Sequence, residues 1–276
     1  MLGRILVGIV GIPLLLFLLL SNNFYNTPLL FLLSVISILG VYELLYLYER
    51  KNIFLNKILV YPIVFISLLS FYFKDFLNIS YLPGIWFIFS VFIYGLYLIF
   101  ADRLENAVNE FGALVFAVFY LGILPGHIML LKNLQYGNYF LLLIVLLIWF
   151  NDTAAYFGGT YLGRKKLLPF KASPNKSYMG LYFALFFSVV SVYFTNWILK
   201  LNIFNNGLLV FTGILFGLIV VFSDLIESVI KRSAGVKDSK SLLPGHGGVL
   251  DIFDSWFFTI PLFYYYVKLL YLFKLL

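Results

Sequence analysis

The sequence predicts an all-α integral membrane protein, on the basis of its composition and the length of its apolar runs. Hydrophobic residues fill 63% of the 276 positions and charged residues only 11%, whereas a soluble domain is typically about a quarter charged. The apolar residues come in continuous runs of about twenty, the length that an α-helix needs to cross the bilayer core. Runs of this kind exclude a β-barrel, and the absence of cysteine excludes disulfides and thiol chemistry.

About nine apolar runs are long enough to be predicted as transmembrane helices. They are residues 5–20, 28–48, 58–73, 83–100, 111–131, 139–157, 180–199, 208–230 and 252–273. The first run follows Arg4, as in a signal peptide, but no small-residue cleavage site comes after it, so we expect it to be retained. We expect one continuous membrane domain, with helices one to five in residues 1–131 and the four catalytic helices with their cytoplasmic loops in residues 132–276.

The basic residues predict the orientation of these helices. Fourteen of the 19 Lys and Arg residues lie at the N-terminus or in the loops after the second, fourth, sixth and eighth spans, and cytoplasmic loops carry such an excess. We therefore expect a multi-pass protein of the cell (inner) membrane with its N-terminus in the cytoplasm. Topogenic charge and attraction to anionic lipid suffice to explain the loop at residues 49–57, whereas the loops after the sixth and eighth spans also adjoin acidic groups within the spans.

Two isolated ionisable residues within the spans are interpreted as structural. Glu43, near the cytoplasmic end of the second span, is expected to reach the interface or to pair with a basic residue. His127 follows Pro125-Gly126 in the fifth span and is expected to be neutral and hydrogen-bonded to a neighbouring helix at a kink. Ionisable groups are costly in hydrocarbon and usually face the protein interior, so each needs a partner of this kind.

The sixth span ends in a polar segment that is open to two interpretations. Asp152 and Tyr156 are four residues apart and share a helix face with the small Ala155. Small residues and the nearby Gly158-Gly159 allow another helix to approach closely. The segment is therefore either a helix-packing motif with a satisfied Asp or part of a functional site.

The eighth span carries a polar stripe along one helix edge. Asp224, Glu227, Ser228, Lys231 and Arg232 follow the i, i+3, i+4, i+7 and i+8 spacing of one face. One interpretation is an intrahelical ladder, in which Ser228 caps Asp224 and Glu227 pairs with Lys231. A stripe this polar beside lipid favours instead a water-filled cavity, which we expect to be the active site and to open to the cytoplasmic side.

The ninth span begins after a glycine-bearing loop and carries a second acidic group. Gly247 and Gly248 allow a positive φ or the close approach of a ligand. Asp251, Asp254 and Ser255 then fall at i, i+3 and i+4 in the first turns of the helix. Negative charge at a helix N-terminus is favourable in itself, which is the structural interpretation of the two aspartates.

These groups suit the chemistry of phosphate transfer at a membrane surface. Asp224 and Asp251, on two helices, could chelate a hard divalent cation, and Mg²⁺ binds one or two carboxylates together with waters and substrate phosphates. Basic side chains suited to phosphate oxygens accompany them, namely Lys176, Lys231, Arg232 and Lys237. Neither a His/Cys set with zinc spacing nor a Walker-type loop is present. The sequence therefore predicts phosphoryl or nucleotidyl transfer to a lipid phosphate, with one or two Mg²⁺ ions and a monovalent cation as a further candidate.

A long gapped pattern near the C-terminus resembles a known family. It reads Ser228-x-x-Lys231-Arg232, then Lys237-Asp238, then Pro244-Gly245-His246-Gly247-Gly248 and Asp251-x-x-Asp254. This pattern resembles the C-terminal signature of the phosphatidate cytidylyltransferase family, also called CDP-diacylglycerol synthases. The segments Asn151-Asp152-Thr153-x-Ala155-Tyr156-x-x-Gly159 and Ser173-Pro174-x-Lys176-Ser177-x-x-Gly180 resemble its other shared stretches. The first five spans match only in hydropathy and length.

The resemblance implies the reaction of CTP with phosphatidate, giving CDP-diacylglycerol and pyrophosphate. The further partners expected are the lipid bilayer and a second copy of the chain in a homodimer, but no nucleic acid. The catalytic residues expected are Asp152, Lys176, Asp224, Lys231, Arg232, Lys237, Asp238, His246 and Asp251, of which Asp224 and Asp251 would also be metal ligands. The substrate-binding residues expected are Asn151, Tyr156, Ser173, Glu227, Ser228, Gly247, Gly248 and Asp254.

Two positions depart from the family pattern and keep alternatives open. Ile252 stands where the family usually has Arg, and Met179 where it usually has Glu. A catalytically weakened homologue is therefore one alternative, and a CTP-dependent kinase or nucleotidyltransferase acting on another lipid is a second. A transporter is a third, but transporters often have paired halves with corresponding broken helices, and here the charge is concentrated in the C-terminal half.

Overall fold

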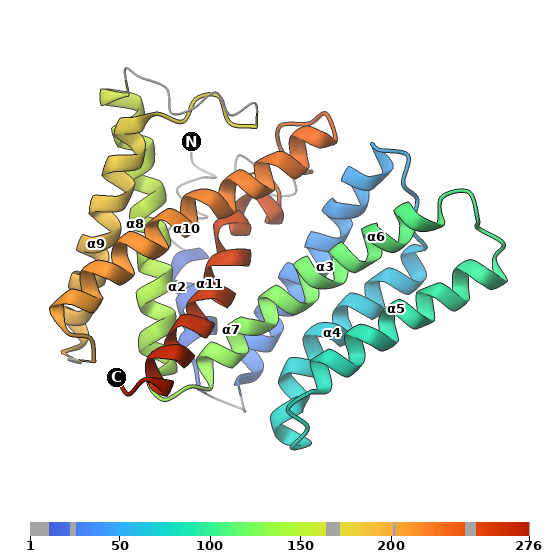
Figure 1. Cartoon of the computed structure of the whole chain (residues 1–276), viewed down its shortest axis with the longest axis horizontal. Coiled ribbons are helices and arrows are strands. Elements are labelled where there is room, and N and C mark those ends of the chain that lie inside the picture. The colour runs from blue at the N-terminus through green and yellow to red at the C-terminus, as the bar shows by residue number, and fades with distance from the viewer. Residues whose placement is uncertain (1–10, 23–25, 164–171, 201–202, 241–246, 276) are drawn as a thin grey trace. The chain divides into compact units, whose positions relative to one another are not determined.

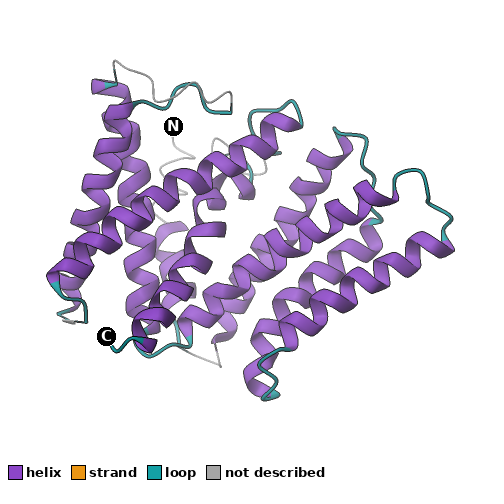
Figure 2. Ribbon diagram, in the orientation of Figure 1, coloured by secondary structure: helices purple, strands orange, loops and turns teal. Residues whose placement is uncertain are grey.

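The computed structural model describes residues 11–22, 26–163, 172–200, 203–240 and 247–275. Every regular element within these ranges is a helix (Figure 2), which confirms the predicted all-α class. In chain order (Figure 1) the elements are α2 (Ile12–Leu20), α3 (Thr27–Glu49), α4 (Lys57–Phe76), α5 (Leu82–Phe100), α6 (Ala107–Val118), the π-helical η3 (Phe119–Ile123), α7 (Leu124–Lys132), α8 (Gly137–Leu162), α9 (Tyr178–Leu199), α10 (Asn206–Ser233) and α11 (Val249–Leu272).

Seven helical segments of the described chain are long and apolar enough to cross a membrane. They are α3, α4, α5, the continuous stretch Ala107–Lys132 that joins α6, η3 and α7, and then α8, α9 and α10. The chain is thus a multi-pass membrane protein. The predicted first span lies partly in residues 1–10, outside the described ranges, and α11 is not among the seven. Nine spans and their orientation therefore stay predictions.

Local sequence signals explain where several of these helices begin. Proline occupies the first turn of α3 and of α5, where its missing N–H and fixed φ cost nothing. The side chain of Asn56 caps α4 by accepting from the backbone N–H of Ile58. Ser177 caps α9 in the same way by accepting from the N–H of Gly180.

The chain divides into two compact units, each with its own packing. The first unit consists of residues 1–130 and 233–252, and the second of residues 131–232 and 253–276. The predicted functional division at residue 131 stays a prediction.

In the first unit, α4 packs against α3, α5 and η3. Buried polar side chains reinforce this packing, because the Glu110 carboxylate accepts from the Tyr94 hydroxyl at 3.0 Å and pairs with Arg103 at 2.8 Å. His127 is buried as expected, but the partner resolved for its Nδ1 is the carbonyl oxygen of Ile123 at 2.9 Å, in its own helix. This carbonyl belongs to η3, where π-helical pairing interrupts the regular α-helical pattern. The predicted hydrogen bond to a neighbouring helix stays a prediction.

In the second unit, α8 and α9 lie along each other. Gly158 makes this close packing possible, because a Cβ at that position would lie only 2.7 Å from the Cβ of Phe183. The rings of Phe216 and Phe263 meet edge-on with centroids 4.9 Å apart, which joins α10 to α11. Helices α8, α10 and α11 of this unit, together with the loop before α9, carry the first group of residues described next.

Candidate active site

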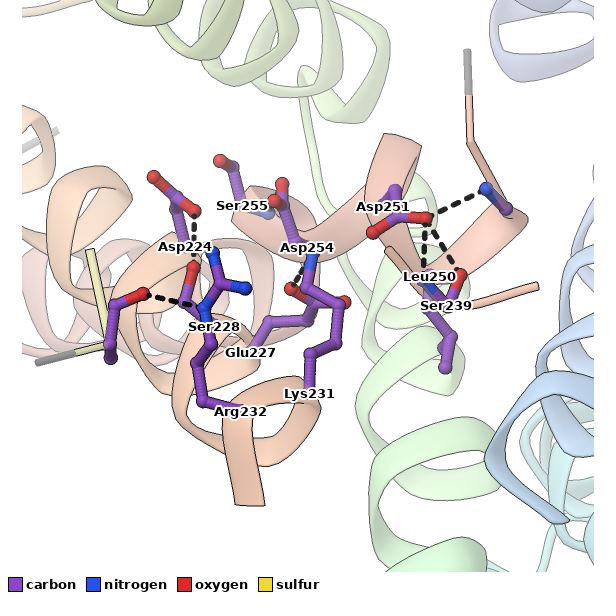
Figure 3. Close-up of polar contacts among 12 residues, drawn as sticks. Asp224, Glu227, Ser228, Lys231, Arg232, Ser239, Leu250, Asp251, Asp254 and Ser255 are labelled. Atoms are coloured by element: carbon purple, nitrogen blue, oxygen red, sulfur yellow. Dashed lines mark hydrogen bonds and ion pairs between the residues drawn. The ribbon is translucent and has the colours of Figure 1, made fainter. Parts of the chain in front are cut away.

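The polar stripe of α10 is anchored by contacts that the sequence predicted only in part. The Oδ2 of Asp224 lies 2.6 Å from the Nζ of Lys176. Figure 3 shows the second contact of Asp224, in which Ser228 donates to Oδ1 at 3.4 Å. Lys176 also donates to the carbonyl oxygen of Val221 at 3.2 Å. The predicted contact between Asp224 and Ser228 is thus present, though long, and the stronger partner of Asp224 is a lysine 48 residues earlier in the sequence.

Glu227 and Lys231 form the predicted intrahelical pair. Their charged atoms lie 2.6 Å apart, and their side chains are only 1% and 10% exposed. A buried ion pair of this kind is costly to break, since removing one partner leaves an uncompensated charge. This half of the stripe is therefore packed inside the second unit, and the more exposed part is formed by Asp224, Ser228 and Arg232.

Arg232, at the end of the stripe, connects α10 to the loop before α9. Its Nε donates to the carbonyl oxygen of Ala172 at 3.2 Å, next to the half-buried Ser173. Lys176 belongs to the same loop, so two of the predicted phosphate-binding residues hold this segment against α10.

Near the end of α8, a buried amide side chain is followed directly by an exposed carboxylate. Asn151 is fully buried and donates to the hydroxyl of Ser188 at 2.9 Å and to the carbonyl oxygen of Gly217 at 3.0 Å, so it links α8, α9 and α10. The next residue, Asp152, is exposed, and so is Tyr156 one turn later. Asn151 therefore packs helices together and Asp152 is accessible, while a functional role for Asp152 stays a prediction.

Three helices of the second unit bring carboxylates within range of one another's charge. The charge of Asp152 on α8 interacts with those of Asp224 on α10 and Asp254 on α11. Lys176 and Lys231 partly compensate this negative charge. Asp254 is fixed locally, because Ser255 N–H donates to its Oδ1 at 2.5 Å and Ser223 donates to its carbonyl oxygen at 2.6 Å.

Asp251 lies in the first unit and closes the first turn of α11. Its Oδ2 accepts from Gly248 N–H at 2.8 Å, from Ser239 N–H at 3.0 Å and from the Ser239 hydroxyl at 2.8 Å (Figure 3). A side chain three residues into a helix that bonds back to the preceding backbone N–H is half of a capping box. The chain enters this turn through Gly247, whose φ of 81° favours glycine.

Glu43 of α3 belongs to the same cluster, although the sequence predicted a different partner for it. Its Oε1 accepts from Val249 N–H at 2.7 Å, and its Oε2 accepts from Leu250 N–H and from the Ser239 hydroxyl, each at 2.8 Å. The side chain is fully buried. The predicted interfacial position is therefore wrong. The partners of Glu43 are a hydroxyl and two helix N–H groups, and the partial positive charge of these N–H groups replaces the predicted basic residue.

The remaining predicted residues are placed as follows. Lys237 and Asp238 are exposed in the loop after α10, Gly247 is half-buried and Gly248 is buried. His246 lies outside the described residues. Lys240, which was not among the predicted site residues, lies with its Nζ 2.5 Å from the hydroxyl of Tyr42 and 4.4 Å from the centroid of that ring.

The donor chemistry of Asp224 fits a Mg²⁺ ligand. Mg²⁺ prefers carboxylate oxygens, and the half-buried Asp224 already has a cationic group, Lys176, at its Oδ2. Asp251 also offers carboxylate oxygens, but its Oδ2 is engaged by three donors that fix its turn. Among the described residues, no group of three or more His, Asp or Glu side chains is arranged to hold a metal ion.

Comparison with known proteins identifies relatives along almost the whole chain. The model of the cytidylyltransferase family matches residues 2–270. A phosphatidate cytidylyltransferase of Bacillus subtilis is 31% identical over 275 residues, which cover 96% of this chain and 97% of that protein. Phosphatidate cytidylyltransferases of Staphylococcus aureus and Haemophilus influenzae are 38% identical over 146 residues and 40% identical over 135 residues. These two alignments cover 53% and 48% of this chain, and 55% and 46% of the relatives.

Proposed function

This chain belongs to the cytidylyltransferase family, and we propose that it transfers the cytidylyl group of CTP to phosphatidate, forming CDP-diacylglycerol and pyrophosphate. The observation that carries this function is similarity to a phosphatidate cytidylyltransferase along nearly the entire chain. A CTP-dependent kinase or nucleotidyltransferase acting on another lipid is not favoured by these relatives.

The proposed reaction requires little covalent chemistry from the protein. A phosphate oxygen of phosphatidate attacks the α-phosphorus of CTP in line, and a new P–O bond forms. The bond from the α-phosphorus to the oxygen that bridges to the β-phosphate breaks, and pyrophosphate leaves with that bonding electron pair. Because the attacking phosphate is already an anion, no strong general base is needed. Catalysis of such a step depends on positioning two polyanions and neutralising their charge.

We assign charge neutralisation to Lys176, Lys231, Arg232 and Lys237. Arg232 and Lys237 are exposed, and Lys176 is half-buried beside Asp224. A phosphate oxygen is an acceptor of the same kind as the carboxylate that Lys176 now contacts. Lys231 is buried with Glu227, so we expect it to act on the substrate less directly than the other three.

We propose that Asp224 and Asp251 hold one or two Mg²⁺ ions, with a monovalent cation as a further candidate. Bound Mg²⁺ would neutralise charge on the triphosphate. Asp152, Asp238 and His246 are proposed to position substrate or water. The other predicted substrate-binding residues keep that role as a proposal, and they are Asn151, Tyr156, Ser173, Glu227, Ser228, Gly247, Gly248 and Asp254.

We further propose nine spans, an N-terminus in the cytoplasm, and an active-site cavity that opens to the cytoplasmic face of the inner membrane. The excess of Lys and Arg in alternate loops supports this orientation. CTP would then arrive from the cytoplasm and phosphatidate from the bilayer. The homodimer is an expectation from the family resemblance.

The decisive experiment uses the purified full-length protein in detergent micelles with labelled CTP. We expect labelled CDP-diacylglycerol and pyrophosphate only when phosphatidate and Mg²⁺ are both present. Formation of CDP together with a phosphorylated lipid would overturn the proposal in favour of a kinase. Transfer to a different lipid phosphate, with none to phosphatidate, would overturn the proposed substrate. Activity without a divalent cation would overturn only the Mg²⁺ assignment.

A further inference from the structure

The N-terminus of α11 is capped by a side chain from a distant part of the sequence. Glu43 accepts hydrogen bonds from the backbone N–H groups of Val249 and Leu250, which lie 206 and 207 positions later in the chain. The first N–H groups of a helix have no partner within the helix. Here both oxygens of one carboxylate bind two of them, and the negative charge also lies at the favourable end of the helix dipole.

This arrangement depends on a glycine at the position where a helix usually supplies its own cap. Ser, Thr, Asp or Asn normally precede the first turn and bind its N–H groups. Gly248 occupies that position and has no side chain to do so. A Cβ at Gly248 would lie 2.4 Å from Oε2 of Glu43 and 2.1 Å from the hydroxyl oxygen of Ser239. Gly248 therefore provides no local cap, and its lack of a side chain leaves the space in which Glu43 caps the helix instead.

The Ser239 hydroxyl connects Glu43 to Asp251. Its oxygen lies 2.8 Å from Oε2 of Glu43 and 2.8 Å from Oδ2 of Asp251. The backbone N–H groups of Ser239 and Gly248 also donate to Asp251, so the loop at Ser239 and the turn at Gly248 together fix the direction of this side chain.

A second contact from α3 holds the same loop. Lys240 follows Ser239, and its ammonium group meets the hydroxyl and the ring of Tyr42, which precedes Glu43. Two adjacent residues of α3 therefore hold two adjacent residues of the loop that leads to α11. Of these two contacts, the one made by Glu43 is buried, whereas the Lys240 side chain in the other is exposed.

We propose that Glu43 is a positioning residue for the transferase reaction. Its carboxylate fixes the first turn of α11 and, through Ser239, the direction of the Asp251 side chain. This role rests on the proposed function, because it treats Asp251 as part of the active site. A group that orients an active-site carboxylate typically affects activity by about 10- to 100-fold when it is removed.

The test compares Glu43→Gln with Glu49→Gln in the full-length protein. Glutamine keeps the size of the side chain but replaces one carboxylate oxygen with an NH₂ group, which cannot accept from the N–H that this oxygen now binds. Glu49 is a matched control on the same helix, where it forms an exposed pair with Lys57. Two measurements are made on each variant, namely the kinetics of CDP-diacylglycerol formation and hydrogen–deuterium exchange of the peptide that covers residues 247–252.

For Glu43→Gln we expect faster exchange in residues 247–252 and unchanged exchange in α4 and α5. We also expect kcat to fall about 10- to 100-fold while the KM for CTP stays nearly constant. Ser239→Ala should reproduce part of both effects. The double variant should lose less than the sum of the two single losses, because both residues act through the same contacts.

Two results would overturn the positioning role. One is a kcat for Glu43→Gln equal to that of Glu49→Gln. The other is faster exchange throughout α3, α4 and α5, with an activity loss that matches the loss of folded protein, since that describes a purely structural residue. If the wild-type protein forms no CDP-diacylglycerol, the proposed function fails instead. The exchange of residues 247–252 then still decides whether Glu43 holds this turn.

Discussion

The ammonium group of Lys176 lies 2.6 Å from the Oδ2 of Asp224 and joins the loop before α9 to the polar edge of α10. The two side chains are 22% and 32% exposed, so neither is sealed from a ligand. The contact brings together a cation suited to phosphate and a carboxylate suited to Mg²⁺. In the proposed mechanism, Lys176 would exchange Asp224 for a substrate phosphate, and Asp224 would exchange Lys176 for a metal ion.

Replacing Lys176 with Met should greatly reduce activity. The change removes one positive charge that the proposed mechanism places on the CTP phosphates, and loss of one such stabilising group typically costs about 100- to 1,000-fold in kcat. Lys176→Arg should retain more activity, because it keeps the charge. The measurement is steady-state formation of CDP-diacylglycerol. Lys268→Met, an exposed change on α11, is the control, and equal activity of the two Met variants would remove Lys176 from the site.

Replacing Asp224 with Asn should abolish most activity and weaken the response to Mg²⁺. Asparagine preserves the shape of the side chain but provides a weaker ligand for a hard divalent cation. The measurement is turnover as a function of Mg²⁺ concentration, after removal of divalent ions with EDTA. Asp75→Asn is a suitable control, because Asp75 is exposed and pairs with its neighbour Lys74. Turnover close to wild type in Asp224→Asn, or in Asp251→Asn, would contradict the assignment of that carboxylate as a ligand.

The sequence predicted the helices of this protein well because their signals are local. Apolar length placed the eighth span at residues 208–230, and α10 runs from Asn206 to Ser233. Helical spacing likewise predicted the contact between Glu227 and Lys231, which are four residues apart and now lie 2.6 Å from each other. Such pairs depend only on the geometry of one helix.

Contacts between helices were harder to predict for a physical reason. Most of these helices are apolar on every side, so the sequence pattern does not indicate which face turns towards a neighbour. The helix N–H partners of Glu43 could not be inferred, since the residue types in a sequence do not show which backbone N–H groups a side chain binds. The one available signal was Gly248, a residue without a capping side chain at the start of a helix. The approach of Asp152 to Asp224 and Asp254 equally depends on how three helices are rotated.

Breaking the buried pair of Glu227 and Lys231 should destabilise the protein strongly. Glu227→Gln removes the closest charged partner of Lys231, whose side chain is only 10% exposed, and breaking a buried ion pair by removing one partner costs about 3–5 kcal/mol. The free energy of unfolding, measured by denaturant titration in micelles, should fall accordingly. The double variant Glu227→Gln with Lys231→Met should recover much of this loss. A single variant as stable as wild type would show that solvent reaches the pair.

Replacing Gly158 with Ala should destabilise the packing of α8 on α9, whereas the same change at Gly112 should not. A Cβ at Gly158 would lie 2.7 Å from two atoms of the Phe183 side chain and 3.0 Å from the carbonyl oxygen of Met179, whereas a Cβ at Gly112 would meet no atom within 4 Å. Overpacking typically costs about 1–3 kcal/mol, while alanine is better than glycine in a helix by about 1 kcal/mol. The melting temperature should therefore fall for Gly158→Ala and stay constant or rise for Gly112→Ala. Equal shifts in both variants would mean that α9 can move away from α8 without cost.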